Sequence, residues 1–306
     1  MEFLEPIPFL QSPEASSRPW TSAEALAYTR WLATRHYENF HVVSLLLPKR
    51  LHQDFYNVYA FCRWADDLGD ETGNPQESLR LLAWWRARLR ALFAGEPPSH
   101  PVFLALSETI ARHQLPLQPF DDLIDAFIQD QTVTRYEDWN HLLDYCRRSA
   151  NPVGRLVLML CGYRDEERFR LSDATCTALQ LANFWQDVSV DLDKGRIYIP
   201  QHLLALHGCP EQDVLARRAT PAFRRALRDA VDYAQALFEQ GLPLSRRVDR
   251  RLALDIDLFS RGGLKVLEKI RAQDYDVFRS RPVISKSERA LLFLASLARL
   301  AFRKAA

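Results

Sequence analysis

The fold of this chain is decided by the stretch Phe55–Asp70, which reads FYNVYAFCRWADDLGD. Aromatic and aliphatic residues recur around its whole circumference, which indicates a helix that is largely buried. Its polar residues follow three- and four-residue spacing and share one side of that helix: Tyr59, Arg63, Asp66, Asp67 and Asp70. Buried carboxylates are costly without a partner, and an internal salt bridge of Arg63 with Asp66 or Asp67 is one explanation of this stripe.

A second polar stripe lies much later in the chain, in Leu179–Asp191, which reads LQLANFWQDVSVD. Here one helical face carries Gln180, Asn183, Asp187 and Asp191, while leucines, valines and aromatic residues occupy the rest. No basic residue lies on this face, so its two carboxylates, one turn apart, call for an external cation. We expect the two helices to face each other across an oxygen-rich cavity that a divalent metal fills.

The side chains of the two stripes predict the metal and the substrate class. Carboxylate oxygens without histidine or cysteine select Mg²⁺, or alternatively Mn²⁺, over zinc. Mg²⁺ usually binds through one or two carboxylates plus substrate phosphates, so the cavity is expected to hold a diphosphate. Arg63, Lys194 and Arg196 can supply charge-assisted contacts to that diphosphate as it departs. The apolar walls favour an isoprenoid diphosphate, whose ionisation gives a carbocation that aromatic faces stabilise.

The composition favours one helical, globular domain. The 306 residues are 47% hydrophobic, and 10 glycines against 17 prolines favour helices whose ends are marked by proline. A formal charge of +1 gives no global field for nucleic acid, so no nucleic-acid partner is expected. We find no repeat or long linker and expect a single all-α domain over residues 1–306. The apolar spacing predicts helices at residues 22–46, 49–70, 76–94, 100–114, 118–131, 137–161, 166–191, 220–240, 246–274 and 286–304.

The cysteines and the two ends of the chain bear on its compartment. Five scattered cysteines without a C-x-x-C pair favour neither a disulfide framework nor a zinc site, which is typical of a reducing cytoplasm. The start, MEFLEPIPFLQSPE, has acids and prolines where a signal peptide needs an unbroken apolar core. The stretch ALLFLASLARLAF from Ala290 is too short to span a bilayer and contains Arg299. It predicts either a core helix or a helix resting on the inner face of the membrane as a peripheral contact.

Longer motifs carry a resemblance that covers nearly the whole chain. The segments are HYENF at 36–40, YAFCR at 59–63, DDLGDE at 66–71, residues 180–191 followed by KGRIYIP at 194–200, DYDVF at 274–278 and RP at 281–282. With these motifs in this order, the chain resembles the squalene and phytoene synthase family. The resemblance implies an isoprenoid synthase helical bundle with a central apolar cavity and two facing aspartate-rich helices.

The resemblance also implies roles for individual residues. Magnesium would be held by Asp66, Asp70, Asp187 and Asp191, with Asp67 nearby. Substrate or its diphosphate would be contacted by His36, Asn39, Tyr59, Arg63, Gln180, Asn183, Lys194, Arg196 and Tyr275.

Several departures from the family's condensing enzymes look like its hydroxysqualene synthase branch, found in hopanoid-making bacteria. The chain has Tyr37 and Asn39 where small hydroxyl residues are usual, Gln186 where arginine is usual, and SANPVG at 149–154 in place of a valine-alanine-glycine stretch. That branch would convert presqualene diphosphate and water to hydroxysqualene and diphosphate through a carbocation that water captures. No nicotinamide is expected, and the enzyme that makes presqualene diphosphate would be a functional partner. Presqualene diphosphate carries one diphosphate, whereas a condensing enzyme must bind two. An enzyme of this branch can therefore tolerate the loss of a cation at Gln186.

Asn151 is our candidate for holding the capturing water, since an amide both donates and accepts hydrogen bonds. Alternatively, residues 149–154 simply form a kink with close helix packing. Two other functions remain open at this point. One is a phytoene- or squalene-type prenyltransferase that condenses two prenyl diphosphates head to head, and the other is an inactive helical interaction protein.

Overall fold

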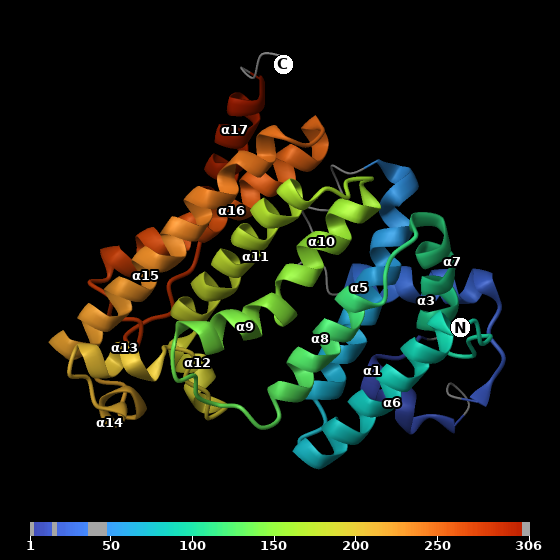
Figure 1. Cartoon of the computed structure of the whole chain (residues 1–306), viewed down its shortest axis with the longest axis horizontal. Coiled ribbons are helices and arrows are strands. Elements are labelled where there is room, and N and C mark those ends of the chain that lie inside the picture. Colours follow the sequence, from blue (N-terminus) through green and yellow to red (C-terminus); the bar gives the residue numbers. More distant parts are fainter. Residues whose placement is uncertain (1–2, 14–16, 36–47, 302–306) are drawn as a thin grey trace. The chain divides into compact units, whose positions relative to one another are not determined.

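The computed structural model describes residues 3–13, 17–35 and 48–301 (Figure 1). In that part of the chain every regular element is a helix, and the only β-type pairing is an isolated bridge between Arg135 and Ile197. The all-α prediction is therefore confirmed. The chain forms two compact units: unit 1 comprises residues 1–132 and 155–164, and unit 2 comprises residues 133–154 and 165–306. The single domain over residues 1–306 stays a prediction.

Unit 1 is built around one long helix, α5 (Lys49–Asp70). Its other complete helices are α1 (Pro6–Gln11), α3 (Ser22–Arg35), α6 (Pro75–Phe93), α7 (Pro101–His113) and α8 (Gln118–Gln129). Proline opens α6 and α7 because its missing N–H costs nothing in a first turn, and the Asn74 side chain caps α6 by accepting from two backbone N–H groups. The predicted bounds 49–70 for the first stripe's helix are confirmed.

A buried polar network fixes the rotation of α5 in unit 1. Asn57 Oδ1 accepts from Thr29 Oγ1 of α3 at 2.6 Å, and its Nδ2 donates to Thr109 Oγ1 of α7 at 3.0 Å. On the apolar side, Trp64 stacks on Trp85 of α6 with ring centroids 5.0 Å apart. A buried amide satisfied on two sides leaves α5 one favourable rotation, and this rotation sets the direction of its aspartates.

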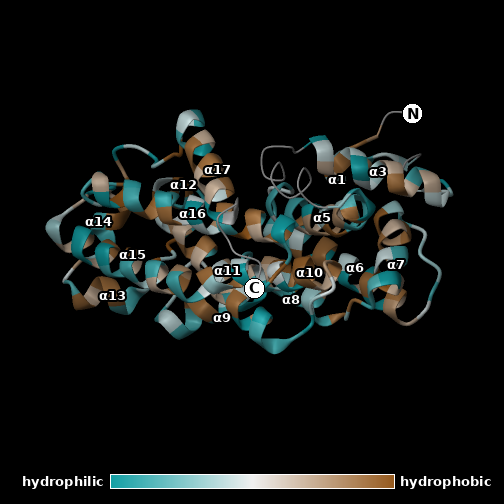
Figure 2. Ribbon diagram, turned by 90° about the horizontal axis from the view of Figure 1, so that it is seen from above, coloured by the Kyte–Doolittle hydropathy of each residue, from teal (hydrophilic) through white to brown (hydrophobic). Residues whose placement is uncertain are grey.

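Unit 2 holds the second stripe. Its elements are α9 (Trp139–Ser149), α11 (Glu166–Gln186), α12 (Val188–Asp193), α13 (Gln201–Leu206), α14 (Glu211–Leu215), α15 (Pro221–Gly241), the 3₁₀ helix η1 (Leu242–Arg246), α16 (Arg250–Ala272) and α17 (Lys286–Ala301); α10 (Asn151–Leu160) starts in this unit and ends in unit 1. Most helices of both units carry hydrophilic and hydrophobic residues together (Figure 2), as expected for amphipathic helices around a core.

Two glycines let the helices of unit 2 approach closely. A Cβ on Gly241 would lie 3.0 Å from the backbone nitrogen of Thr175 in α11, and one on Gly263 of α16 would meet the ring of Phe238 in α15. The helices α15, α11 and α16 thus pack at distances that only glycine allows at these points. This packing holds α11, the helix that carries Gln180 and Asn183, against the core of unit 2.

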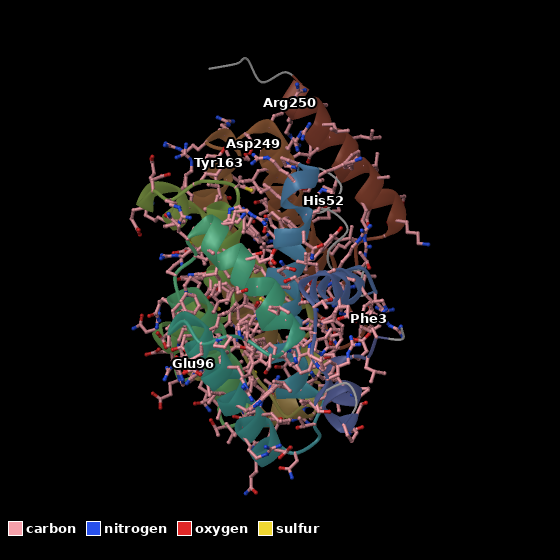
Figure 3. All side chains as sticks on the ribbon, turned by 90° about the vertical axis from the view of Figure 1, so that its right-hand side faces the viewer. Phe3, His52, Glu96, Tyr163, Asp249 and Arg250 are labelled. Carbon is pink, nitrogen blue, oxygen red and sulfur yellow. The ribbon has the colours of Figure 1, made fainter. Side chains whose placement is uncertain are left out.

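Two predicted helices are each divided into two in the structure, although the apolar spacing of the sequence continues across the break. The prediction 137–161 becomes α9 and α10, which part at Ala150, and the prediction 166–191 becomes α11 and α12, which part at Asp187. The prediction 246–274 started too early, because Asp249, labelled in Figure 3, precedes α16 and caps it. Its carboxylate accepts from the N–H groups of Arg251 and Leu252. The short helices α1, α13 and α14 were not predicted at all.

Two further sequence predictions can be compared with the structure. All five cysteines are free thiols, in agreement with the absence of a disulfide framework. Within the described ranges, no helix combines the length and the apolar character that a bilayer crossing requires.

Candidate active site

The first stripe, on α5, contains a short ion pair. Arg63 Nη2 lies 2.5 Å from Asp67 Oδ1, and Arg63 Nη1 lies 3.5 Å from Asp66 Oδ2. The Asp67 side chain is only 6% exposed, and burial raises the pKa of this carboxyl to about 7 although Arg63 opposes the rise. The internal salt bridge considered from the sequence is therefore formed, with Asp67 as the main partner.

Asp66 and Asp70 lie on the accessible side of α5, one turn apart. The Asp66 side chain is 46% exposed and Asp70 is exposed, so the expectation that this stripe is buried was wrong for both. The reason is that the apolar residues of α5 suffice to pack α3, α6, α7 and α8 without covering this face. Tyr59 is half-buried on the same side, and burial raises the pKa of its hydroxyl to about 12, so it remains a hydrogen-bond donor at neutral pH.

The second stripe continues across the break between α11 and α12. The backbone N–H of Asp187 donates to the carbonyl of Asn183 at 2.9 Å, and that of Asp191 donates to the carbonyl of Asp187 at 2.8 Å. These two helical hydrogen bonds keep Asn183, Asp187 and Asp191 in helical register, as the sequence spacing predicted. Asn183 is exposed and Gln180 is half-buried, so the polar face of α11 is accessible as well.

The prediction that no protein cation serves the second stripe was wrong. The Arg281 guanidinium forms a bidentate ion pair with Asp187: its Nε contacts Oδ1, and its Nη2 lies 3.0 Å from Oδ2. The next residue along the chain is tied to the same place, because Gln186 Nε2 donates to the carbonyl of Pro282. The sequence argument considered only cations on the stripe's own helix, whereas Arg281 comes from the segment between α16 and α17.

Gln186 lies beside this ion pair. A missing cation at Gln186 was expected to be tolerable in an enzyme that handles one diphosphate. Arg281 places a cation next to Asp187, but it belongs to the Arg-Pro motif on which the family resemblance rests. The expectation about Gln186 therefore stays a prediction.

Lys194 and Arg196 lie in a turn that closes α12. Gly195 has φ +73°, a conformation that glycine adopts readily, and the Arg196 N–H donates to the Asp191 carbonyl at 2.9 Å. Arg135 fastens the turn by donating from Nη1 to the Gly195 carbonyl at 2.6 Å. Lys194 and Arg196 are thus held next to the end of the second stripe.

Two other candidates are engaged in packing. The Tyr275 side chain is buried, its backbone has φ +60°, and the Arg228 guanidinium of α15 lies 5.3 Å from its ring centroid. Asn151 is buried at the start of α10, where its Oδ1 accepts from Thr177 Oγ1 of α11 at 2.9 Å. A Cβ on Gly154 would collide with the side chains of Ser172 and Cys176. The close-packing interpretation of residues 149–154 is therefore realised, and the water-holding role of Asn151 stays a prediction.

His36 and Asn39 lie outside the described residues. In the ranges that are described, no three His, Cys, Asp or Glu side chains gather into a group able to hold a metal ion. Sequence reasoning missed the roles of Arg281 and Arg135. Arg281 had a usable signal, because it opens the Arg-Pro pair that ends the chain's last motif.

The comparisons with known proteins support what this geometry suggests. A family model described as squalene/phytoene synthase matches residues 33–288. The chain belongs to the squalene/phytoene synthase family. This membership confirms the resemblance drawn from the motifs, and it makes the chain a member of a family of prenyl diphosphate condensing synthases.

Individual members of the squalene/phytoene synthase family are similar along nearly their whole length. The 15-cis-phytoene synthase of Synechococcus elongatus is 32% identical over 289 residues, which cover 89% of this chain and 92% of the relative. The hydroxysqualene synthase of Zymomonas mobilis is 32% identical over 271 residues, covering 86% and 88%.

Solved structures of the squalene/phytoene synthase family confirm the isoprenoid synthase fold. Squalene synthase HpnC from Alicyclobacillus acidocaldarius has a TM-score of 0.80 and 48% identity, with 83% of this chain and 95% of that chain covered. A dehydrosqualene synthase in complex with ligand has a TM-score of 0.82 and 25% identity, with 92% and 98% covered.

Proposed function

We propose that this protein is an Mg²⁺-dependent hydroxysqualene synthase, which converts presqualene diphosphate and water to hydroxysqualene and diphosphate. The observation that carries the proposal is the 48% identity with squalene synthase HpnC, against 32% with 15-cis-phytoene synthase. This difference favours a squalene-type over a phytoene-type skeleton. The choice of water as the final reactant rests on the variants at Tyr37, Asn39 and residues 149–154 and on the similarity to the hydroxysqualene synthase of Zymomonas mobilis.

The residues present suit magnesium by the chemistry of their donor atoms. Asp66, Asp70, Asp187 and Asp191 offer only carboxylate oxygens, which suit Mg²⁺ or Mn²⁺, and the Asp66 side chain is half exposed and so accessible to a metal. Each stripe thus offers two of these carboxylates, which agrees with the tendency of Mg²⁺ to complete its coordination shell with water and substrate phosphate. When bound, the metal would neutralise the diphosphate and stabilise it as a leaving group.

The chain's own residues then orient the diphosphate and the carbocation. Arg63 is held in place by Asp67, so that carboxylate orients a guanidinium in our proposal rather than binding metal. Lys194 and Arg196 are fixed by the turn at Gly195 and offer charge to the departing diphosphate. Tyr59 retains its proton and can donate it in a hydrogen bond. Gln180 and Asn183 provide neutral amides on the accessible face of α11.

The function is tested by product analysis with two substrates supplied separately. With presqualene diphosphate and Mg²⁺, and without nicotinamide, we expect hydroxysqualene and diphosphate. With farnesyl diphosphate alone, we expect no product. Conversion of farnesyl diphosphate would establish the second candidate, a head-to-head condensing enzyme, which the 32% identity with 15-cis-phytoene synthase favours.

The metal assignment has its own variants. Asp66→Asn and Asp187→Asn should each lower turnover by about 100-fold or more, as expected when a group that stabilises the departing charge is lost. Asp193→Asn is the matched control, because Asp193 lies on α12 beyond the stripe and is paired with Arg217. Equal turnover in Asp187→Asn and Asp193→Asn would contradict the assignment.

The remaining alternative is an inactive interaction protein, whose thermal midpoint should not change when ligands are added. Binding to the native state alone raises the thermal midpoint. Mg²⁺ together with a non-hydrolysable diphosphate analogue should therefore raise the midpoint of the active enzyme, and an interaction protein would melt at the same temperature with and without them.

The water-holding role of Asn151 can be separated from its packing role. Asn151→Ala removes the amide, while Thr177→Val removes only the hydroxyl that donates to it. We expect hydrocarbon by-products from Asn151→Ala and fewer from Thr177→Val. Unchanged hydroxysqualene output without by-products in Asn151→Ala would refute the role.

A further inference from the structure

Two polar side chains of helix α17, Glu288 and Ser296, face the body of unit 2. Glu288 Oε1 pairs with Lys269 Nζ of α16 at 2.9 Å, and its Oε2 accepts from the Ser285 N–H at 2.8 Å. Ser296 is fully buried. The one carboxylate of α17 is therefore used within unit 2, both as an ion-pair partner and as a cap of its own helix.

The outward face of α17 is apolar instead. Residues 290–298 read ALLFLASLA and contain no charged side chain. Leu291 is 65% exposed and Leu294 is 61% exposed, with Phe293 and Leu297 also exposed. At 100° per residue, Phe293, Leu297 and Leu294 follow one another around the same side of the helix. Four large apolar side chains on one exposed helical surface are more than scattered surface leucines.

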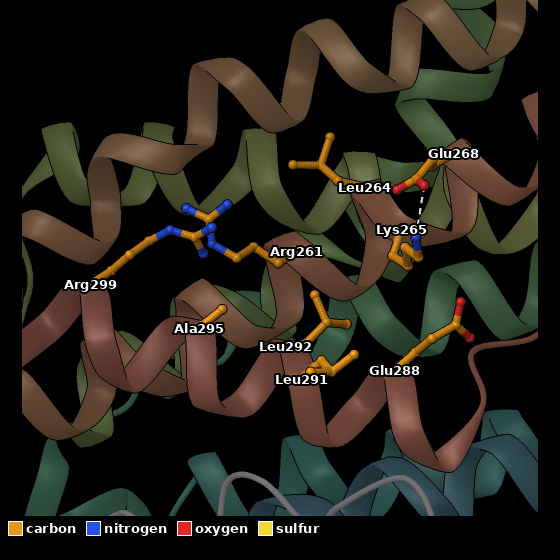
Figure 4. A pocket seen from close by; sticks show the side chains of 9 residues that line it. All are labelled: Arg261, Leu264, Lys265, Glu268, Glu288, Leu291, Leu292, Ala295 and Arg299. Atoms are coloured by element: carbon orange, nitrogen blue, oxygen red, sulfur yellow. Dashed lines mark hydrogen bonds and ion pairs between the residues drawn. The ribbon is translucent and has the colours of Figure 1, made fainter.

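Cations border this apolar surface at both ends. Lys286 and Arg289 are exposed at the start of α17, and Arg299 is exposed near its end. Beside the helix lies a hollow of about 370 Å³ between α16 and α17, whose lining includes Arg261, Lys265 and Arg299 (Figure 4). Lys265 pairs with Glu268 there.

Positive charge is in excess at the Arg299 end of the hollow. Two guanidinium groups share one buried carboxylate: Asp257 Oδ2 lies 2.8 Å from Arg261 Nε and 3.8 Å from Arg299 Nη1. A second anion can therefore be accommodated beside the apolar surface. Arginine forks of this kind match phosphate oxygens well.

We propose that α17 docks on an anionic lipid bilayer. The leucines and Phe293 would enter the acyl boundary, and Arg299 with Arg261 would contact a lipid phosphate, as in interfacial helices that combine an apolar face with bordering cations. A second copy of this chain fits less well, because α17 offers no exposed carboxylate to face the cations of another α17. The proposal is independent of which isoprenoid the enzyme converts.

The experiment is co-sedimentation of the full chain with vesicles of two compositions, phosphatidylglycerol with phosphatidylcholine in equal parts and phosphatidylcholine alone. We expect binding to the first. Leu294→Gln should weaken it by about tenfold or more, since a polar amide replaces an inserted apolar group. Leu206→Gln is the matched control: Leu206 is 71% exposed on α13, away from α17 in sequence, and this variant should bind like wild type.

Two further measurements separate the lipid from other occupants. Arg299→Gln should lower binding to the anionic vesicles by about fivefold, the effect expected for one basic residue near the surface. Turnover of detergent-dispersed substrate should be equal in wild type and Leu294→Gln. This assay reports on the proposed reaction alone, so a failure of the reaction can be distinguished from a failure of vesicle binding.

Three results would overturn the proposal: no sedimentation of wild type with anionic vesicles, equal sedimentation of Leu294→Gln, or a dimer that forms without vesicles and is lost in Leu294→Gln. A fourth result would also contradict the lipid proposal. If inorganic phosphate raises the thermal midpoint by as much as anionic vesicles do, the site binds a free anion rather than a lipid.

Discussion

Removing Arg281 should strengthen the binding of Mg²⁺ to the second stripe. This guanidinium contacts both oxygens of Asp187, whose side chain is only 13% exposed. A metal that uses Asp187 must first displace the guanidinium. Arg281→Gln removes this competition while keeping a polar side chain.

The size of the effect follows from the geometry of the pair. A hydrogen bond to a charged group contributes about 1.5–3 kcal/mol. The Arg281 side chain is itself about half exposed, which reduces the net value of the pair toward about 1.4 kcal/mol. Because 1.4 kcal/mol corresponds to a factor of ten in an equilibrium constant, Arg281→Gln should bind Mg²⁺ about tenfold more tightly.

The assay is calorimetric titration of substrate-free protein with Mg²⁺. Arg217→Gln is the control. Arg217 pairs with Asp193, which lies on α12 outside the second stripe. The Arg217→Gln protein should therefore bind Mg²⁺ with the affinity of wild type. In a background of Asp187→Asn, the Arg281 substitution should have no effect. Unchanged or weaker Mg²⁺ binding by a folded Arg281→Gln protein would refute the reasoning.

Three further predictions concern stability. Gly263→Ala should lower the free energy of unfolding, measured with urea, by about 1–3 kcal/mol, because its Cβ would lie 2.8 and 2.9 Å from two ring carbons of Phe238. At the neighbouring Gly262 a Cβ would have no contact closer than 4.0 Å. Gly262→Ala should therefore raise the free energy of unfolding by up to about 1 kcal/mol through its higher helix propensity. Asp54→Ala should cost about 3–5 kcal/mol by the same measurement, because this carboxylate, 1% exposed, accepts from the Thr109 hydroxyl, pairs with the Arg112 guanidinium and contacts the His113 ring. Burial lowers the pKa of His100 to about 3, so in the unfolded chain, near pH 6.5, it binds a proton that the folded chain excludes; the difference in stability between wild type and His100→Asn should therefore fall with pH below about 6.5 by up to about 1.4 kcal/mol per unit.

The helices with caps and strong apolar spacing could be predicted from the sequence. The bounds of α5 agree because Pro48 precedes it and its apolar residues continue to Leu68. The break at Asp187 could not be predicted, since the apolar spacing continues across it. The break at Ala150 lies within the kink considered for residues 149–154, although the predicted helix 137–161 runs through it. The short helices α13 and α14 could not be predicted, because apolar periodicity is recognisable only over several helical turns.

Which residues form the candidate site was partly readable from spacing along one helix. The shared faces of Asp66 with Asp70 and of Asp187 with Asp191 follow from local geometry. The ion pair of Arg281 with Asp187 joins residues 94 positions apart, and no local pattern encodes such a contact. The same limit explains why Arg63 could not be assigned to Asp67 rather than Asp66, since both lie at helical spacing from it.

The network around Asn57 has a consequence for engineering this enzyme. Asn57 lies on the side of α5 that contacts α3 and α7, and nine residues later, half a rotation around the helix, comes Asp66. A shift of the helix by one residue would turn both by 100° and break the hydrogen bonds of Asn57 with Thr29 and Thr109. Substitutions on the side of α5 that carries Asp66 and Asp70 should therefore leave the rotation of this helix unchanged, provided that Asn57, Thr29 and Thr109 are kept.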